Sequence, residues 1–123
     1  MTLNELYGII DGDYEQALKV LRIDKLIDKH IRRFPTSGVA DALVSAAVDM
    51  DHVRLFETAH ALKGVCANLG LIKMYELASA IAEEYRPGNA RRLSDEQVKE
   101  TIGKIGELYK KTTEGVRLYE QSL

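Results

Sequence analysis

Positions near the C-terminal end of the chain repeat at alternating intervals of four and three residues, and most of them are apolar. An α-helix turns once every 3.6 residues, so positions with this spacing fall on one side of a helix. The segment Ser94-Asp95-Glu96-Gln97 before them has the form of a capping box, which favours the start of a helix. The pattern predicts one long amphipathic helix whose buried face consists of Val98, Ile102, Ile105, Tyr109, Thr112, Val116 and Tyr119.

Helical spacing continues through the rest of the chain, and no segment alternates between apolar and polar residues for long enough to indicate a strand. Pro35 and Gly70 favour the ends of helices, and the Arg-Pro-Gly-Asn segment at 86–89 favours a turn. The sequence therefore predicts an all-α fold, a four-helix bundle with additional short N-terminal helices. The residues expected to cap helix starts are Thr2, Asp13, Asp24, Ser37 or Asp41, Asp51 and Ser94.

The size and composition of the chain are those of a single globular domain. It has 123 residues, of which 46% are hydrophobic and 29% are charged, enough to bury a core and leave a polar surface. We expect one domain over residues 1–123, with an N-terminal helical segment over 1–22 and the helical bundle over 24–120.

Charge and hydropathy argue against several kinds of partner. The net charge is −2 and both signs are interspersed, so there is no basic surface for nucleic acid or anionic lipid. No run of 18 apolar residues occurs, and the first residues do not resemble a secretion signal. We expect a cytoplasmic monomer that binds neither nucleic acid nor membrane. The single cysteine, Cys66, lies on an apolar helix face and is expected to be buried.

The helix expected after Asp51 places a histidine on its polar side. At about 100° per residue, His60, Lys63, Gly64 and Ala67 form one patch turned away from the apolar stripe of the helix. The histidine should therefore be exposed to solvent. The stripe consists of Leu55, Ala59, Leu62, Cys66 and Leu69.

These residue types suit the transfer of a phosphoryl group. Imidazole is largely unprotonated near neutral pH, so a ring nitrogen of His60 can attack phosphorus without a separate base. Lys63, one turn further on, places a positive charge near the phosphoryl oxygens. The sequence predicts that His60 accepts the phosphoryl group and that Lys63 stabilises it.

The residues around His60 predict a protein as the phosphoryl partner. Gly64 weakens a helix by about 0.5–1 kcal/mol relative to alanine, and close approach of a partner to the histidine would explain its presence. Val53 and Phe56 place apolar side chains beside the histidine and outside the buried stripe, as in an exposed docking surface. We expect Val53, Phe56, Gly64 and Ala67 to form that surface.

The same residues match a known motif, His-x-Leu-Lys-Gly with a further glycine ten residues after the histidine. Over residues 42–88 the chain resembles the histidine-containing phosphotransfer (HPt) domains of bacterial multistep phosphorelays. The resemblance implies that His60 exchanges a phosphoryl group with the aspartate of a response-regulator receiver domain, which supplies magnesium, or with a hybrid histidine kinase. It also implies a phosphocarrier without kinase activity or a cofactor of its own. The matching residues are His60, Leu62, Lys63, Gly64 and Gly70.

One position departs from the family pattern. Many HPt domains have Gln or Glu twenty-two residues after the histidine, hydrogen-bonded to the imidazole, and this chain has Ala82 there. Ser79 or Glu83 on the same expected helix could take its place, or the imidazole is left without such a partner.

Two other interpretations use the same residues. A helical adaptor that binds or sequesters a receiver domain needs the exposed face but no chemistry, and Ala82 favours this alternative. Glu57 and His60 have the Glu-x-x-His spacing of di-iron bundles, but such a site needs a second pair that the chain lacks, so we expect no metal site. His30 and His52 are expected to be structural histidines.

Overall fold

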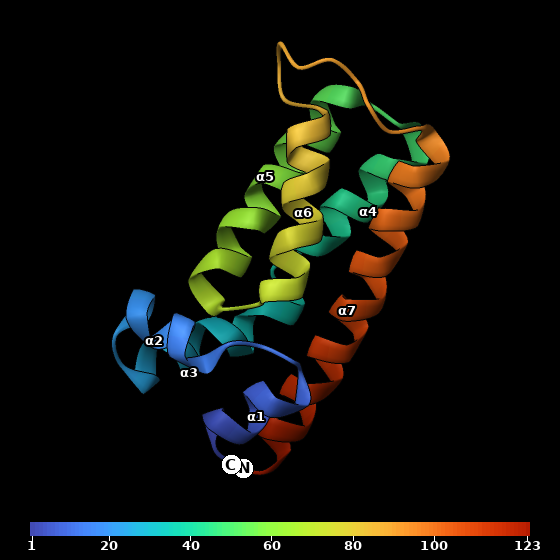
Figure 1. Cartoon of the computed structure of the whole chain (residues 1–123). Coiled ribbons are helices and arrows are strands. Elements are labelled where there is room, and N and C mark those ends of the chain that lie inside the picture. Colours follow the sequence, from blue (N-terminus) through green and yellow to red (C-terminus); the bar gives the residue numbers. More distant parts are fainter.

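The computed structural model describes residues 1–123 and consists of α-helices joined by short loops, with one 3₁₀ turn and no strand. Helices α4 to α7 form a four-helix bundle, and the short helices α1 to α3 lie together at one end of it (Figure 1). No helix is long and apolar enough to cross a membrane. The predicted fold class is confirmed. The elements are α1 (Leu3–Ile9), α2 (Tyr14–Leu21), α3 (Asp24–Arg33), η1 (Phe34–Thr36), α4 (Val39–Asp49), α5 (His52–Leu69), α6 (Ile72–Glu84) and α7 (Asp95–Gln121).

Four helices begin where the sequence predicts a cap. The side chains of Thr2, Asp13, Asp51 and Ser94 each accept a hydrogen bond from a backbone N–H in the first turn of α1, α2, α5 and α7. Such bonds satisfy donors that have no partner inside the helix. Local sequence therefore sets these four helix starts.

The predicted caps of α3 and α4 are wrong. Ile23 is the N-cap of α3, because its backbone is extended (φ −134°, ψ 147°) and Asp24 is already helical. The Asp24 carboxylate instead accepts a hydrogen bond from the hydroxyl of Tyr14 across the α2–α3 turn. The N-cap of α4 is Gly38, at a φ of 77° that favours glycine. The hydroxyl of Ser37 makes only a long contact, 3.4 Å, with the first N–H of α4.

The apolar faces predicted for α5 and α7 are buried. The whole stripe of α5 is at most 2% exposed, and every predicted position of α7 is buried except the half-buried Tyr109. Burial raises the pKa of the Cys66 thiol to about 12, as expected for a cysteine with a packing role. The apolar core includes residues from all seven α-helices, so the N-terminal helices share it with the bundle.

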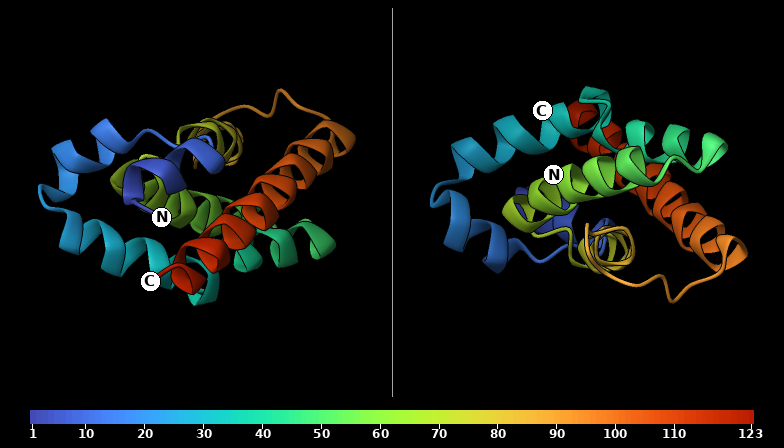
Figure 2. Two further views of the ribbon diagram at one scale, coloured as in Figure 1. Left: turned by 90° about the horizontal axis from the view of Figure 1, so that it is seen from below. Right: turned by 90° about the horizontal axis from the view of Figure 1, so that it is seen from above.

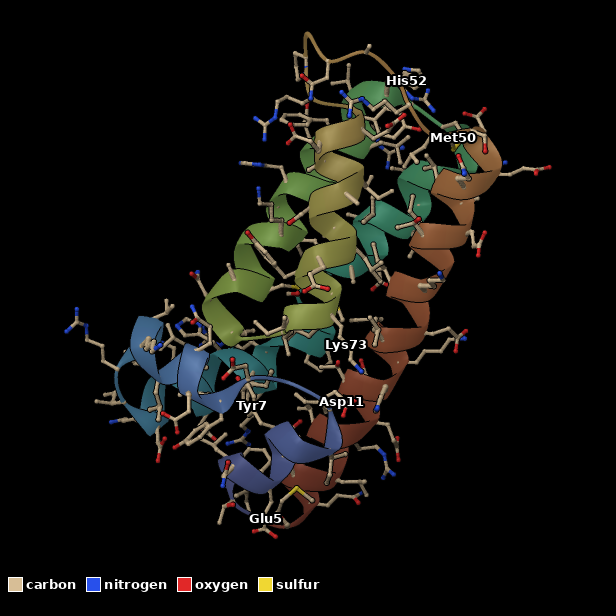
Figure 3. The ribbon with its side chains drawn as sticks, viewed as in Figure 1. Glu5, Tyr7, Asp11, Met50, His52 and Lys73 are labelled. Carbon is tan, nitrogen blue, oxygen red and sulfur yellow. The ribbon has the colours of Figure 1, made fainter.

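Polar contacts attach the N-terminal helices to the bundle. The hydroxyl of Tyr7 donates to the backbone carbonyl of Leu69 at 2.8 Å. Asp11, in the α1–α2 turn, pairs with Lys73 of α6 at 3.5 Å and with Lys111 of α7 at 2.5 Å. Figure 3 shows Tyr7, Asp11 and Lys73 where these helices meet. One end of the bundle is therefore closed by residues from the start of the chain.

Gly70 joins the end of α5 to the start of α2. It has a φ of 67°, and its carbonyl accepts a hydrogen bond from the N–H of Asp13 at 2.7 Å. A Cβ atom at this position would collide with the backbone carbonyl of Asp13. Glycine is needed here for both its backbone conformation and its size.

Candidate functional site

His60 lies at the middle of α5, on the exposed side of the helix. Its imidazole makes no hydrogen bond and stacks instead on the ring of Phe56, one turn earlier, with 5.6 Å between ring centroids and 23° between ring planes. Aromatic stacking of this kind restricts the rotation of a side chain. Packing against Phe56 therefore orients the histidine.

The other predicted site residues surround His60 on the same helix. Val53 is 65% exposed, and Lys63 and Ala67 are half-buried. A Cβ atom at Gly64 would have no neighbour within 4 Å, so the surface there is open. The structure thus brings the six residues together on α5, and an approaching molecule would meet no side chain at Gly64.

No side chain of α6 binds the imidazole. Ala82 is fully buried. Glu83 accepts hydrogen bonds from Nε of Arg86 at 3.1 Å and from Nδ2 of Asn89 at 3.1 Å, and the hydroxyl of Ser79 is buried without a hydrogen-bond partner. The sequence left open Ser79, Glu83 or no partner for the imidazole. In the structure, the imidazole receives no hydrogen bond from α6.

Arg86, just after α6, lies against Phe56. Its guanidinium lies 5.8 Å from the centroid of the Phe56 ring. Hydrogen bonds from Asn89 and Arg86, with a smaller contribution from the charge of Lys63, lower the pKa of Glu83. Helical spacing gives no sign of this contact, because Arg86 lies in the Arg-Pro-Gly-Asn segment, whose residues indicate only a turn.

The histidine, lysine and glycine on the open face of α5 have the arrangement that the motif implies. A family model, the Hpt domain, matches residues 26–109 of the chain. The chain belongs to the Hpt domain family. Proteins of this family are phosphocarriers in two-component signalling and interact with receiver domains and histidine kinases. No curated protein and no solved structure matches the chain.

The matched residues of this Hpt domain contain all the predicted site residues but not the first two helices. They run from α3 to the middle of α7, and therefore contain His60 and Lys63. Helices α1 and α2 precede the match, although their side chains belong to the same core. The predicted family is confirmed, and α1 and α2 lie outside the matched residues.

The Hpt domain holds its longest loop in place with one buried carboxylate. Glu84, at the end of α6, accepts hydrogen bonds from Nε of Arg91 at 2.6 Å and from the backbone N–H groups of Arg92 and Leu93, both at 3.0 Å. Burial opposes ionisation of Glu84, but these hydrogen bonds outweigh it and lower its pKa. Nη1 of Arg91 also lies 3.2 Å from Nε2 of His52.

His52 and His30 have surroundings different from those of His60. The His52 ring packs on Tyr85, with 4.9 Å between centroids, at the end of the bundle that Figure 3 shows beneath the long loop. His30 lines a cavity beside α5. No group of three or more His, Cys, Asp or Glu side chains is placed to hold a metal ion.

Proposed function

We propose that this Hpt domain accepts a phosphoryl group on His60 and exchanges it with the aspartate of a response-regulator receiver domain in a multistep phosphorelay. A hybrid histidine kinase is the corresponding partner on the supplying side. The observation that supports the proposal is the exposure of His60 on α5 with Lys63 one turn away and open space over Gly64. Phosphoryl transfer depends on positioning and on charge, and these residues provide both.

The transfer exchanges one bond to phosphorus for another. The unprotonated nitrogen of His60 attacks the phosphorus of the receiver's aspartyl phosphate, a P–N bond forms, and the P–O bond to the aspartate breaks to release its carboxylate. The charge of Lys63 offsets that of the phosphoryl oxygens. In the reverse direction the aspartate attacks phosphohistidine. We propose that the magnesium belongs to the receiver and that this chain contributes no cofactor.

The docking role of the surrounding residues follows from the same geometry. In-line attack requires the two reacting atoms to come within about 3–3.5 Å of each other. Gly64 leaves room for the receiver beside His60, and Val53 and Ala67 offer exposed or half-buried apolar surface on either side. Phe56 contributes to docking and also orients the imidazole.

The test is transfer of label from a phosphorylated receiver domain. We expect the label on His60, in a form that acid removes and alkali does not, as for a P–N bond. His60→Gln should abolish labelling, whereas His30→Gln and His52→Gln should retain it. Full labelling of His60→Gln, or loss of label only in the other two variants, would contradict the assignment.

A helical adaptor that binds a receiver domain without accepting phosphate is the second candidate. The observation that favours it is the lack of a hydrogen bond to the imidazole from Ser79, Ala82 or Glu83. The same experiment separates the two functions: an adaptor would bind the receiver, measured by titration calorimetry, and would remain unlabelled.

A further inference from the structure

Three apolar side chains are exposed around the turn between α2 and α3. Val20 is 41% exposed, Ile23 is 52% exposed and Leu26 is 37% exposed. Helices α2 and α3 extend sideways beyond the bundle, near the C-terminal end of α5 (Figures 1 and 2). We name these three residues the α2–α3 arm.

The turn between α2 and α3 has two features that are locally unfavourable. Ile23 is the N-cap of α3 and provides no side-chain hydrogen bond, although Ser, Thr, Asp or Asn at an N-cap satisfies a backbone N–H. Arg22, next to it, has a φ of 74°, which is unfavourable for a residue with a Cβ atom. The exposed isoleucine therefore adds apolar surface at a position where a polar residue would be more stable.

A cavity lies beside the arm, against the helix that carries His60. It has a volume of about 220 Å³ and lies between α2, α3 and α5. Leu21 of α2 lines it together with Val65 and Asn68 of α5, and these two residues directly follow Gly64 and Ala67 of the predicted docking surface. The cavity therefore lies between α2, whose Leu21 is next to Val20 of the arm, and the residues of α5 that follow the predicted docking surface.

A receiver domain centred on His60 is large enough to reach the arm. An interface of standard size covers about 800 Å² on each partner, which corresponds to a radius of roughly 16 Å. The distance along α5 from His60 to its last residue, Leu69, is about 14 Å at 1.5 Å per residue. A partner that covers the histidine would extend as far as the cavity and the first residues beyond it.

The charges beside the arm suit the same partner. Arg33 lines the cavity, and Lys19 and Lys25 are exposed on either side of the turn, which also carries the exposed Asp24. A receiver domain that holds magnesium does so with carboxylates next to its phosphorylated aspartate. Cationic side chains near that acidic surface would favour association and its correct orientation.

We propose that the α2–α3 arm and the adjoining cavity form a second contact for the receiver domain and select which receivers exchange phosphate with His60. This inference rests on the proposed function. Val20 and Ile23 precede residue 26, where the family match begins, so the selectivity would come from a part of this chain outside the matched residues. The receiver that fits has an apolar side chain near its acidic active-site surface.

Ile23→Asp is the decisive variant, because its effects on folding and on docking have opposite signs. Aspartate is a better N-cap than isoleucine, so thermal stability should hold or rise. Transfer from a panel of phosphorylated receiver domains should fall at least tenfold at low receiver concentration and recover as the receiver approaches saturation. Val20→Asp should act in the same way. Val48→Asp, which changes a 79% exposed valine on α4, is the matched control and should transfer normally.

Labelling by phosphoramidate separates the arm from the chemistry, because this small donor needs no docking surface. We expect phosphoramidate to label His60 equally in the wild type and in both arm variants. If receivers label the wild type and Ile23→Asp at the same rate, the arm does not select them and the inference is overturned.

If phosphoramidate labels the wild type and no receiver does, the proposed function itself fails. A wild-type dimer that Ile23→Asp converts to monomer in sedimentation would assign the arm to a second copy and overturn the receiver contact.

Discussion

His60 is surrounded by three residues of its own helix that act on it in different ways. Phe56 orients the ring by stacking, Lys63 supplies positive charge, and Gly64 leaves the approach open. All three lie within one turn of the histidine, and each can be changed without touching the buried stripe of α5. Their contributions can therefore be measured one at a time.

Gly64→Gln should separate stability from transfer. The substitution removes a glycine from the helix interior where a Cβ atom meets nothing within 4 Å, so the free energy of unfolding should hold or rise by up to about 1 kcal/mol. A glutamine beside His60 would keep the receiver's aspartate from in-line distance, and roughly 1 Å of misplacement can slow a reaction on the order of 100-fold. Denaturant unfolding and transfer rates on one sample measure both effects.

Gly103→Gln on α7 is the control for Gly64→Gln, since a Cβ atom there also meets no neighbour. It should give a similar gain in stability and leave transfer unchanged. Normal transfer in Gly64→Gln would show that the glycine does not serve close approach, and unfolding would show that it packs against another element.

Lys63→Ala should slow transfer because the charge near the phosphoryl oxygens is lost. The free energy of unfolding should change by only a few tenths of a kcal/mol, because Lys63 makes no ion pair in the structure. Lys99→Ala, at an exposed position of α7, is the matched control. Unchanged transfer in Lys63→Ala, or a large loss of helical circular dichroism, would contradict the role given to this lysine.

At the scale of elements, the loop between α6 and α7 depends on a single carboxylate. Glu84 accepts hydrogen bonds from one side chain and two backbone N–H groups of the loop. The same loop contacts the start of α5 through Arg91 and His52. The ends of three bundle helices are thus held together by one buried ionised group, and its protonation should loosen them.

Glu84→Gln should lower the free energy of unfolding by about 2 kcal/mol at pH 7, since hydrogen bonds to a charged group are lost. The pKa of Glu84 in the folded protein lies below its ordinary value of 4.5. The stabilisation is therefore fully present above pH 4.5 and is lost as the pH falls through the lower pKa of the folded state. The difference between wild type and variant should shrink in acid. Glu76→Gln, at an exposed position of the same helix, should show no such dependence.

At the scale of the whole molecule, α1 lies against the C-terminal half of α7, far from it in sequence. Gly115 lies where the two helices meet, and a Cβ atom there would collide with the side chain of Ile10 and lie 3.4 Å from that of Leu6. The absence of a side chain on α7 allows α1 to approach it. The N-terminal helices therefore belong to the same packed core as the bundle.

Gly115→Ala should destabilise the protein by about 1–3 kcal/mol, because overpacking at this contact outweighs the better helix propensity of alanine. Gly103→Ala, on an open part of the same helix, should instead raise the free energy of unfolding by up to about 1 kcal/mol. Denaturant unfolding of the two variants measures the difference. A gain in stability for Gly115→Ala would show that α1 does not pack closely on α7.

Features that depend on residues within a turn or two of each other could be predicted from the sequence alone. The stripe of α5, the exposure of His60, the cap at Thr2 and the capping box at Ser94 follow from helical spacing and local hydrogen bonds, and the structure has them as predicted. The family was also recognisable from its motif, because the motif residues lie on one helix and its end.

Features that join distant segments were decided only by the tertiary structure. The carboxylate of Asp24 binds Tyr14 of the preceding helix and does not cap α3, and Arg86 reaches Phe56 only because α6 packs along α5. The pairing of Asp11 with Lys111 joins residues 100 positions apart. Helical periodicity specifies which face of each helix is buried but not which side chains of another helix meet it, and only packing in three dimensions fixes those contacts.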